Sequence, residues 1–363
     1  MAQATARDFA DFVALTLKDL GPPNFQQIAQ NLQSYDCMSK WLRKERVMLD
    51  SGNGIQRNLM SRLSNQAAHV GLMDNDTYDI PDLIDQMDVP WRHAQTKWGY
   101  IYQTDILMNG AKSLIANVIE PRRADAMISL AEELEAKAWQ TPTASDKVNP
   151  YGIPYWIVYN ATTGFNGGTP SDHTTVGGID LTSSPNFKNY VDTYTNVTKT
   201  DLIRKMRKAA RKIGWKSPIS LKDYRRGSGQ KLQIYTDETR LGLLEEIGEG
   251  QNENLGRDLA PVQGDSGSSK DIGQVDFQLV FRRHPIFWVP QLDDTNVFTA
   301  CTAPLYMIDH STFYPVVLRG DFLRESEPMR VPNRHNLFRI FIDLTYNYLC
   351  IDRRRNALFA TGS

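Results

Sequence analysis

Residues 337–351, LFRIFIDLTYNYLCI, form a long run rich in aromatic and β-branched residues. Such residues favour strands. Shorter runs of the same kind precede it at residues 278–281, 285–290, 303–309 and 312–318, and Pro, Asp and Asn separate them. A last run, residues 356–360, follows the basic triplet Arg353 to Arg355. The C-terminal third is therefore predicted to be a succession of strands, and its sequence contains no catalytic constellation.

The composition is that of a globular protein with a substantial core. The chain has 363 residues, of which 41% are hydrophobic and 23% charged, enough for two domains or one large domain. Its 41 basic and 42 acidic residues nearly cancel, which argues against a dedicated nucleic-acid binder but leaves a shell lining open. No apolar run reaches the roughly 18 residues that cross a bilayer, and residues 1–8 lack a signal pattern.

The three cysteines, Cys37, Cys301 and Cys350, lie far apart and form no C-x-x-C pair. This spacing predicts synthesis in a reduced compartment and cysteines that act as small buried hydrophobes.

Helical spacing of apolar residues predicts helices over residues 7–20, 24–32, 104–138, 202–213 and 239–247. Pro121 is expected to kink or restart the longest of them. A predicted strand at residues 231–235 makes the region between 141 and 303 resemble an α/β layer. Residues 47–100 are polar and punctuated by Gly, Asn and Pro, but they are too long for a structureless connection, so we expect an extended β-ribbon there.

Several chemical motifs are weaker than they look. Residues 264–267, Gly-Asp-Ser-Gly, resemble the nucleophile stretch of trypsin-like peptidases, but no preceding histidine has the setting that would make it the base for Ser266. The six histidines are scattered singly, so we expect no metal site and no cofactor. The acidic run Glu245, Glu246, Glu249 and Glu253 indicates a solvated face or a subunit contact rather than an acid and base pair.

The order of the C-terminal segments resembles that of the major capsid proteins of tailed bacteriophages, which have the Hong Kong 97-type fold. Residues 287–290, 308–310, 312–351 and 353–360 fill the places of that family's first strand, turn, long two-strand ribbon and final strand after an Arg-rich bend. Residues 175–180, followed by an aromatic segment at 187–194 and a helix, match a second stretch found in many phage coat proteins.

This resemblance implies an α+β fold with four parts. They are an N-terminal arm (1–46), an extended β-ribbon called the E-loop (47–100), a peripheral domain with a long spine helix (101–140 and 311–351), and an axial domain (141–310 and 352–363). Residues 227–230 and 248–267 would be tip loops at the five-fold and six-fold axes. A bend at 319–321 and an excursion at 325–336 would project toward local three-fold axes.

The implied function is structural and not enzymatic: self-assembly into pentamers and hexamers of an icosahedral phage capsid that encloses double-stranded DNA. The protein would be made in the bacterial host cytoplasm and reside in the virion, with no membrane contact. The stretch ahead of the E-loop is short for a removable scaffolding region, so the expected partners include a separate scaffolding protein, a portal protein, a decoration or cement protein, and DNA bound without sequence specificity. The alternatives are an encapsulin-like compartment shell and a serine hydrolase using Ser266.

Two sets of residues follow as candidate sites. Candidate intersubunit contacts are Phe9, Phe12, Trp91, Trp98, Arg319 and Arg330. The two phenylalanines and the two tryptophans could instead pack within their own subunit. Candidate contacts to packaged DNA or an acidic scaffold lie on one basic helix: Arg204, Arg207, Lys208 and Arg211. The alternative for this helix, which we favour, is a solvated face with intersubunit ion pairs. A covalent bond from Lys97 to Asn333 or Asn336, as in some relatives, is not expected.

Overall fold

The fold is seen in a computed structural model of the chain, which describes residues 40–61, 67, 69–71, 82–107, 112–214, 231–253, 272–275, 278–282 and 284–361. The predicted helices at 7–20 and 24–32, with Phe9 and Phe12, lie outside these residues, as do the tip loop at 227–230, most of that at 248–267, and Ser266. The described strands form sheets of five, seven and two strands.

The five-stranded sheet is built on the predicted long ribbon. Strands β11 (Phe313–Glu325) and β13 (Arg334–Cys350) pair antiparallel, and β4 (Arg92–Ile101) lies along the other side of β13. Strands β1 (Val47–Leu49) and β12 (Met329–Val331) complete the sheet. The predicted bend at 319–321 is an irregularity within β11, at which Gly320 has φ +85° and the register shifts, so the strand continues instead of turning back.

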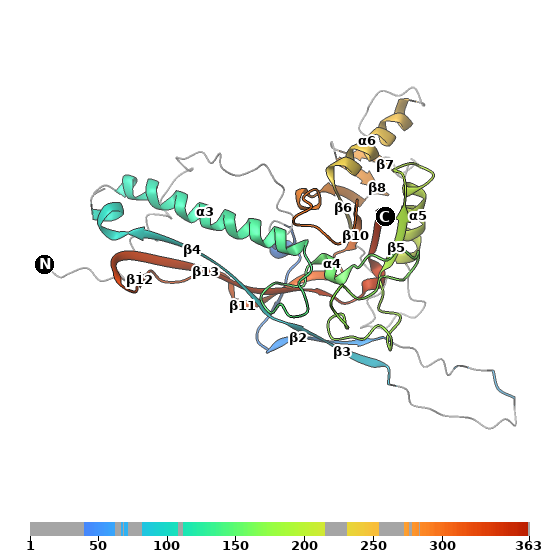
Figure 1. Cartoon of the computed structure of the whole chain (residues 1–363), viewed down its shortest axis with the longest axis horizontal. Coiled ribbons are helices and arrows are strands. Elements are labelled where there is room, and N and C mark those ends of the chain that lie inside the picture. Colours follow the sequence, from blue (N-terminus) through green and yellow to red (C-terminus); the bar gives the residue numbers. More distant parts are fainter. Residues whose placement is uncertain are drawn as a thin grey trace.

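Helix α3 (Lys112–Ala138) lies along β4 as the predicted spine (Figure 1). A π-helical segment, η2 (Tyr102–Leu107), lies ahead of it in the chain, and α3 runs through Pro121 without a break, so the predicted helix does not restart there. The buried residues of α3 recur at helical spacing: Ile119, Ala126, Leu130 and Leu134. They belong to one core with residues of β4 and β13 in the five-stranded sheet: Trp98, Tyr100, Phe338 and Ile340.

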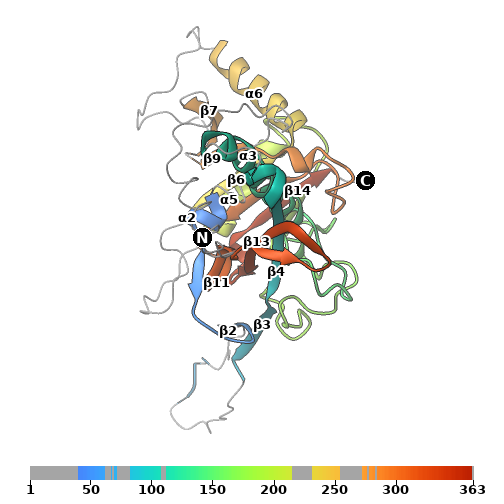
Figure 2. The same cartoon turned by 90° about the vertical axis from the view of Figure 1, so that its left-hand side faces the viewer.

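The two-stranded sheet is a ribbon of β2 (Gly54–Met60) and β3 (Ile84–Pro90) that projects from the body (Figure 1 and Figure 2). It is shorter than the predicted E-loop, because β1 and β4 on either side of it belong to the five-stranded sheet. Lys97 is therefore not at the end of a ribbon but lies on β4, opposite Phe341 of β13. A fully buried side at Ile55, Met87 and Val89 anchors the ribbon root in the main core.

The ribbon is held against a tight turn at residues 176–179. Val176 and Ile179 exchange both backbone hydrogen bonds, and Gly177 and Gly178 have φ of +59° and +85°. The turn meets β3 where the backbone N–H of Asp88 donates to the Gly177 carbonyl at 3.0 Å. Nearby, the Ser61 and Ser184 hydroxyls both donate to the Asp85 carboxylate.

We expect Gly177→Ala to lower the free energy of unfolding by about 2 kcal/mol, because an Ala residue is strained at positive φ. In addition, its Cβ would lie 2.8 Å from the indole of Trp156, which is fully buried. Urea denaturation of the unassembled chain measures the change. The matched control is Gly242→Ala in helix α6, where a Cβ meets nothing within 4 Å and the change should raise stability by about 0.5 to 1 kcal/mol. Equal stability of Gly177→Ala and wild type would contradict the prediction.

The seven-stranded sheet has the order β5-β14-β10-β6-β9-β8-β7. Its strands are β5 (Tyr190–Tyr194), β6 (Leu232–Thr236), β7 (Ile272–Val275), β8 (Gln278–Phe281), β9 (His284–Trp288), β10 (Leu305–Asp309) and β14 (Ala357–Thr361). Helix α5 (Leu202–Ile213) contacts β5, and helix α6 (Glu238–Glu253) contacts β7 and β9. The predicted helices at 202–213 and 239–247 and the strand at 231–235 are thus confirmed. The remaining short elements are α2 (Leu42–Lys44), α4 (Ile153–Trp156), η3 (Pro290–Leu292) and η4 (Arg353–Arg355).

An aromatic cluster around Trp41 joins the two larger sheets. The Trp41 indole is fully buried and lies 5.5 to 6.2 Å, centroid to centroid, from the neighbouring rings. Trp139 directly follows α3, and Tyr235 lies on β6 of the seven-stranded sheet. Phe313 and Tyr348 lie on β11 and β13 of the five-stranded sheet. Contacts of this kind bury large apolar areas, so the cluster fixes how the sheets meet.

The predicted Arg-rich bend is the 3₁₀ turn η4, and two of its three guanidinium groups are inside the protein. Arg353 is fully buried and donates to three carbonyl oxygens and one side-chain oxygen, those of Trp156, Phe187, Gly168 and Asn189. Arg355 is 3% exposed and lies 2.9 Å from the buried Asp309 carboxylate. The triplet therefore positions β14 and the loops around it and does not form a charged surface.

Candidate functional site

The histidines serve different structural roles. His310 is buried and its Nε2 lies 2.8 Å from the Tyr235 hydroxyl. His93 is exposed, with Nδ1 2.9 Å from the Thr345 hydroxyl and Nε2 3.6 Å from the Asp343 carboxylate. In the part of the chain that the structure describes, no three His, Cys, Asp or Glu side chains are grouped so that they could hold a metal ion. Over the same residues, no helix is long and apolar enough to span a membrane.

The two predicted tryptophan contacts have different environments. Trp98 is only 6% exposed and packs in the main core beside Tyr100, so little of its surface is available to a second subunit. The alternative of packing within its own subunit therefore describes it better, although Trp98 lies on β4 opposite Ile340 and not at the ribbon root. Trp91 is half-buried, and its Nε1 donates to the Gly52 carbonyl at 2.9 Å across the ribbon root. An intersubunit role for Trp91 stays a prediction.

The two predicted arginine contacts are both exposed on the five-stranded sheet. Arg319 on β11 forms an ion pair of 2.7 Å with Asp50, and both side chains are largely in solvent. Arg330 on β12 stands over the Phe338 ring, with its guanidinium carbon 5.6 Å from the ring centroid. Exposed ion pairs stabilise a chain little, so Arg319 is free to exchange its partner in an assembly.

The predicted basic helix α5 presents most of its cations to solvent. Arg204, Lys208 and Arg211 are exposed and Arg207 is half-buried. The apolar side of the helix, which includes Met206 and Ile213, is buried against the core of the seven-stranded sheet. A cleft of about 550 Å³ runs beside the helix and is lined by Thr163, Asp192, Thr200, Arg204, Lys205, Lys208 and Arg211. The sequence identified this basic surface, but the cleft depends on the loop before β5.

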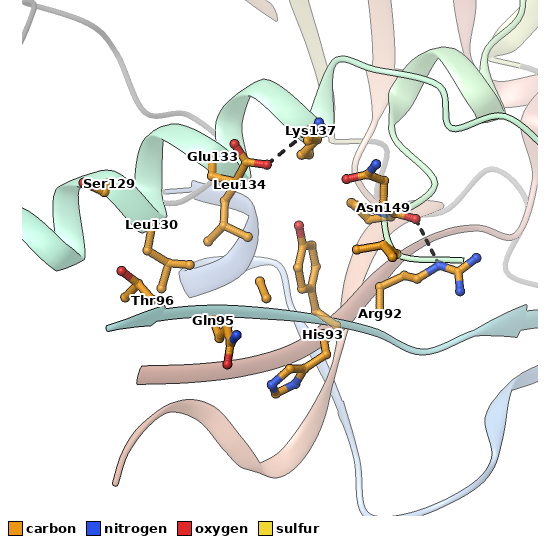
Figure 3. Close-up of a pocket in the computed structure, with 14 residues that line it drawn as sticks. Arg92, His93, Gln95, Thr96, Ser129, Leu130, Glu133, Leu134, Lys137 and Asn149 are labelled. Atoms are coloured by element: carbon orange, nitrogen blue, oxygen red, sulfur yellow. Dashed lines mark hydrogen bonds and ion pairs between the residues drawn. The ribbon is translucent and has the colours of Figure 1, made fainter. Parts of the chain in front are cut away.

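A second cleft, of about 330 Å³, lies between α3, β4 and residues 148–150 (Figure 3). Arg92 holds the adjoining loop in place by donating to the carbonyl oxygens of Lys147, at 2.6 Å, and Asn149, at 3.0 Å. Leu130 and Leu134 of α3 are buried beneath this cleft, and Val148 beside it is 72% exposed. An apolar centre with a polar rim is typical of protein contact surfaces.

A surface that the sequence analysis did not identify lies at the α6 end of the seven-stranded sheet. Trp288 on β9 is 37% exposed and Leu243 on α6 is 38% exposed. Trp288 Nε1 donates to the Asp293 carboxylate at 2.6 Å, and the same carboxylate accepts from the N–H of Glu238 at the start of α6. The sequence offered one signal for this exposure, the position of Trp288 near the end of the predicted strand at 285–290.

No protein-family model matches the sequence, and no curated protein matches it. Solved structures do match along nearly the whole chain. The capsid asymmetric unit of cyanophage A-1(L) is 13% identical with a TM-score of 0.60, covering 96% of this chain and 98% of its own. The capsid of a native GTA particle is 10% identical with a TM-score of 0.54, covering 95% and 96%. The capsid of Myoviridae phage XM1 is 7% identical with a TM-score of 0.51, covering 93% and 95%.

Proposed function

We propose that this chain, which has the Hong Kong 97-type fold of those phage capsid structures, is a structural subunit of an icosahedral capsid. The observation that carries the proposal is the extent of the likeness, which covers 96% of this chain and 98% of the cyanophage A-1(L) capsid chain. The spine helix, the long ribbon, the projecting ribbon and the seven-stranded sheet are all part of one such subunit. The comparisons do not favour the encapsulin-like alternative.

In this proposal the chain assembles into pentamers and hexamers that enclose double-stranded DNA, without enzymatic activity. It is made in the bacterial host cytoplasm and resides in the virion. Its partners are other copies of itself, a separate scaffolding protein, a portal protein, DNA and a decoration or cement protein. Contacts of the projecting ribbon and of an N-terminal arm would add interface area beyond the globular body, and many modest contacts together stabilise a shell.

The end of the projecting ribbon supports a contact with a second subunit. Met60 of β2 and Ile84 of β3 lie opposite each other in the register and are 58% and 60% exposed. An isolated two-stranded ribbon is marginally stable in water, and two large apolar side chains at its end favour packing against another surface. A neighbouring subunit supplies that surface in the proposed shell.

The test is assembly, with and without the scaffolding protein, followed by negative-stain electron microscopy. We expect closed shells or rings of five and six subunits from the wild-type chain. The variant Met60→Asp/Ile84→Asp should fold with unchanged thermal stability but assemble at least about tenfold less efficiently. The reason is that packing the ribbon end against a neighbour would bury the two new carboxylates in an apolar interface. A wild-type chain that stays monomeric under every condition would contradict the proposal.

A further inference from the structure

The two ends of the seven-stranded sheet carry opposite charges. Helix α5 contacts β5, the strand at one end of the sheet, and α6 contacts β7 and β9 toward the other end. Strands in a sheet lie about 4.8 Å apart, which separates β5 from β7 by roughly 30 Å. We call Arg204, Lys208 and Arg211 on α5 the basic edge, and Glu238, Glu245 and Glu246 on α6 the acidic edge.

The basic edge holds cations that the subunit itself does not neutralise. Arg204, Lys208 and Arg211 recur at spacings of four and three on one side of α5, and within the described residues none of them forms a hydrogen bond or ion pair. All three line the 550 Å³ cleft.

The other charged residues of this cleft are already paired. Lys205 bonds to Asp201 and donates to the Thr193 carbonyl at 2.6 Å. The Asp192 carboxylate accepts from the Thr163 hydroxyl at 2.9 Å and from the N–H of Thr193 at 3.0 Å. The cleft therefore presents a net positive surface that fits an acidic partner.

The acidic edge has the composition of an interface. Glu238 and Glu246 are exposed and Glu245 is half-buried, and none has an ion-pair partner within the described residues. Two exposed large apolar side chains, Trp288 and Leu243, lie on β9 and α6 at this end of the sheet. An exposed tryptophan with charged residues around it is the usual pattern of an energetically important contact.

We propose that the basic edge of one subunit binds the acidic edge of the next, head to tail around each ring of the assembly. A symmetric dimer through either edge would set like charges against each other, whereas a head-to-tail contact sets opposite charges together. The chain as a whole has a net charge of −1, so charge segregation, and not overall charge, orients the contact. This inference rests on the proposed capsid function and names the surfaces by which its rings form.

The test exchanges the charges of the two edges. Variant A is Arg204→Glu/Lys208→Glu/Arg211→Glu, and variant B is Glu245→Lys/Glu246→Lys. Each alone has two edges of the same sign, so we expect each to need at least about tenfold more protein for ring assembly than wild type. A chain that combines all five changes restores opposite edges and should assemble again.

Mixing the two variants provides a sharper test. A and B subunits can alternate around a ring of six but not around a ring of five, because an odd ring leaves two like edges in contact. An equimolar mixture should therefore form six-membered rings in which the variants alternate, and few five-membered rings, counted by electron microscopy and by native mass spectrometry. Raising the salt concentration should weaken wild-type assembly, since screening acts on exposed charges.

Matched controls separate charge pairing from folding. Arg204→Lys/Arg211→Lys keeps the charges, and Lys212→Glu reverses one charge on the same helix outside the residues that line the cleft; both should assemble like wild type. Circular dichroism and thermal melting check that variants A and B are folded.

Three outcomes would overturn the inference. If A and B assemble like wild type, or if neither the combined chain nor the mixture regains rings, the edges do not pair. If variant A forms normal rings but loses binding to double-stranded DNA or to an acidic scaffold, the basic edge serves that partner instead. In these cases wild-type rings still form, and the proposed function stands. If the wild-type chain forms no rings at all, both the proposed capsid function and the pairing of the two edges are wrong.

Discussion

Replacing Arg353 by methionine is expected to lower the free energy of unfolding by about 3 to 5 kcal/mol, which is enough to leave little folded protein. The Arg353 guanidinium is fully buried and makes four hydrogen bonds, at 2.6 to 3.0 Å, to carbonyl and amide oxygens. Burial lowers its pKa to about 10, so the group is charged at neutral pH. Methionine removes the charge and leaves the buried Trp156 and Phe187 carbonyl oxygens without the donors that Arg353 gives them, whereas the Asn189 amide oxygen still accepts from the Val158 N–H.

The acceptors of Arg353 come from segments that are distant in the sequence, which is why the loss should be large. The Trp156 carbonyl belongs to the last residue of α4, the Phe187 carbonyl and Asn189 precede β5, and the Gly168 carbonyl lies between them in the sequence. A single planar guanidinium holds these loops to β14. Arg353→Lys keeps the charge but not the fork of donors, so it should be destabilised by at least about 2 kcal/mol.

Urea denaturation of the unassembled chain measures both substitutions. The matched control is Arg354→Met, one residue along the same turn, where the guanidinium is half-buried, bonds to Asn186 at 3.2 Å and stands over the Phe165 ring. That change should alter stability by less than about 1 kcal/mol. If Arg353→Met expresses as insoluble protein, the Arg353→Lys variant carries the measurement. Equal stability of Arg353→Lys and wild type would show that the several N–H donors of the buried guanidinium are not needed.

The second large effect is acid destabilisation through His310. Burial, together with the smaller effect of the nearby Lys40 and Lys231 charges, lowers the pKa of His310 to about 3. The unfolded chain binds a proton at this residue below about pH 6.5, whereas the folded chain does not bind it until about pH 3. Titration of His310 therefore costs no stability above pH 6.5. As the pH drops toward 3, it lowers the free energy of unfolding by roughly 1 kcal/mol for each pH unit.

The variant His310→Gln tests this linkage, because glutamine can still bond to the Tyr235 hydroxyl but does not titrate. At pH 7 it should be less stable than wild type by about 1 to 2 kcal/mol, since it disturbs the aromatic cluster around Trp41. Between pH 6.5 and 4 its stability should fall less steeply than that of wild type, and the two should converge. His335→Gln, an exposed histidine, is the control and should keep the wild-type slope. Parallel slopes for His310→Gln and wild type would contradict the prediction.

Much of the fold was predictable because its signals are local. The long run at 337–351 became β13, and the alternation of helix and strand around residues 202–247 became α5, β6 and α6. These patterns depend on neighbouring residues and on the side of an element that faces a core. The candidate surfaces were less predictable. Basic residues on α5 could be read as exposed, but Trp98, equally plausible as an interface anchor, is in the core.

Local sequence patterns predicted the long ribbon, the helices that became α5 and α6, and an order of C-terminal segments that resembles phage capsid proteins. The tertiary structure decided that β4 pairs with β13 instead of extending the ribbon, that Arg353 and Arg355 are buried, and that α5 and α6 lie at opposite ends of one sheet. The physical reason is that periodicity shows which side of an element is buried, but not which distant element buries it. Strand pairing and the burial of a charge depend on partners far away in the chain, so they are decided when the sheets form.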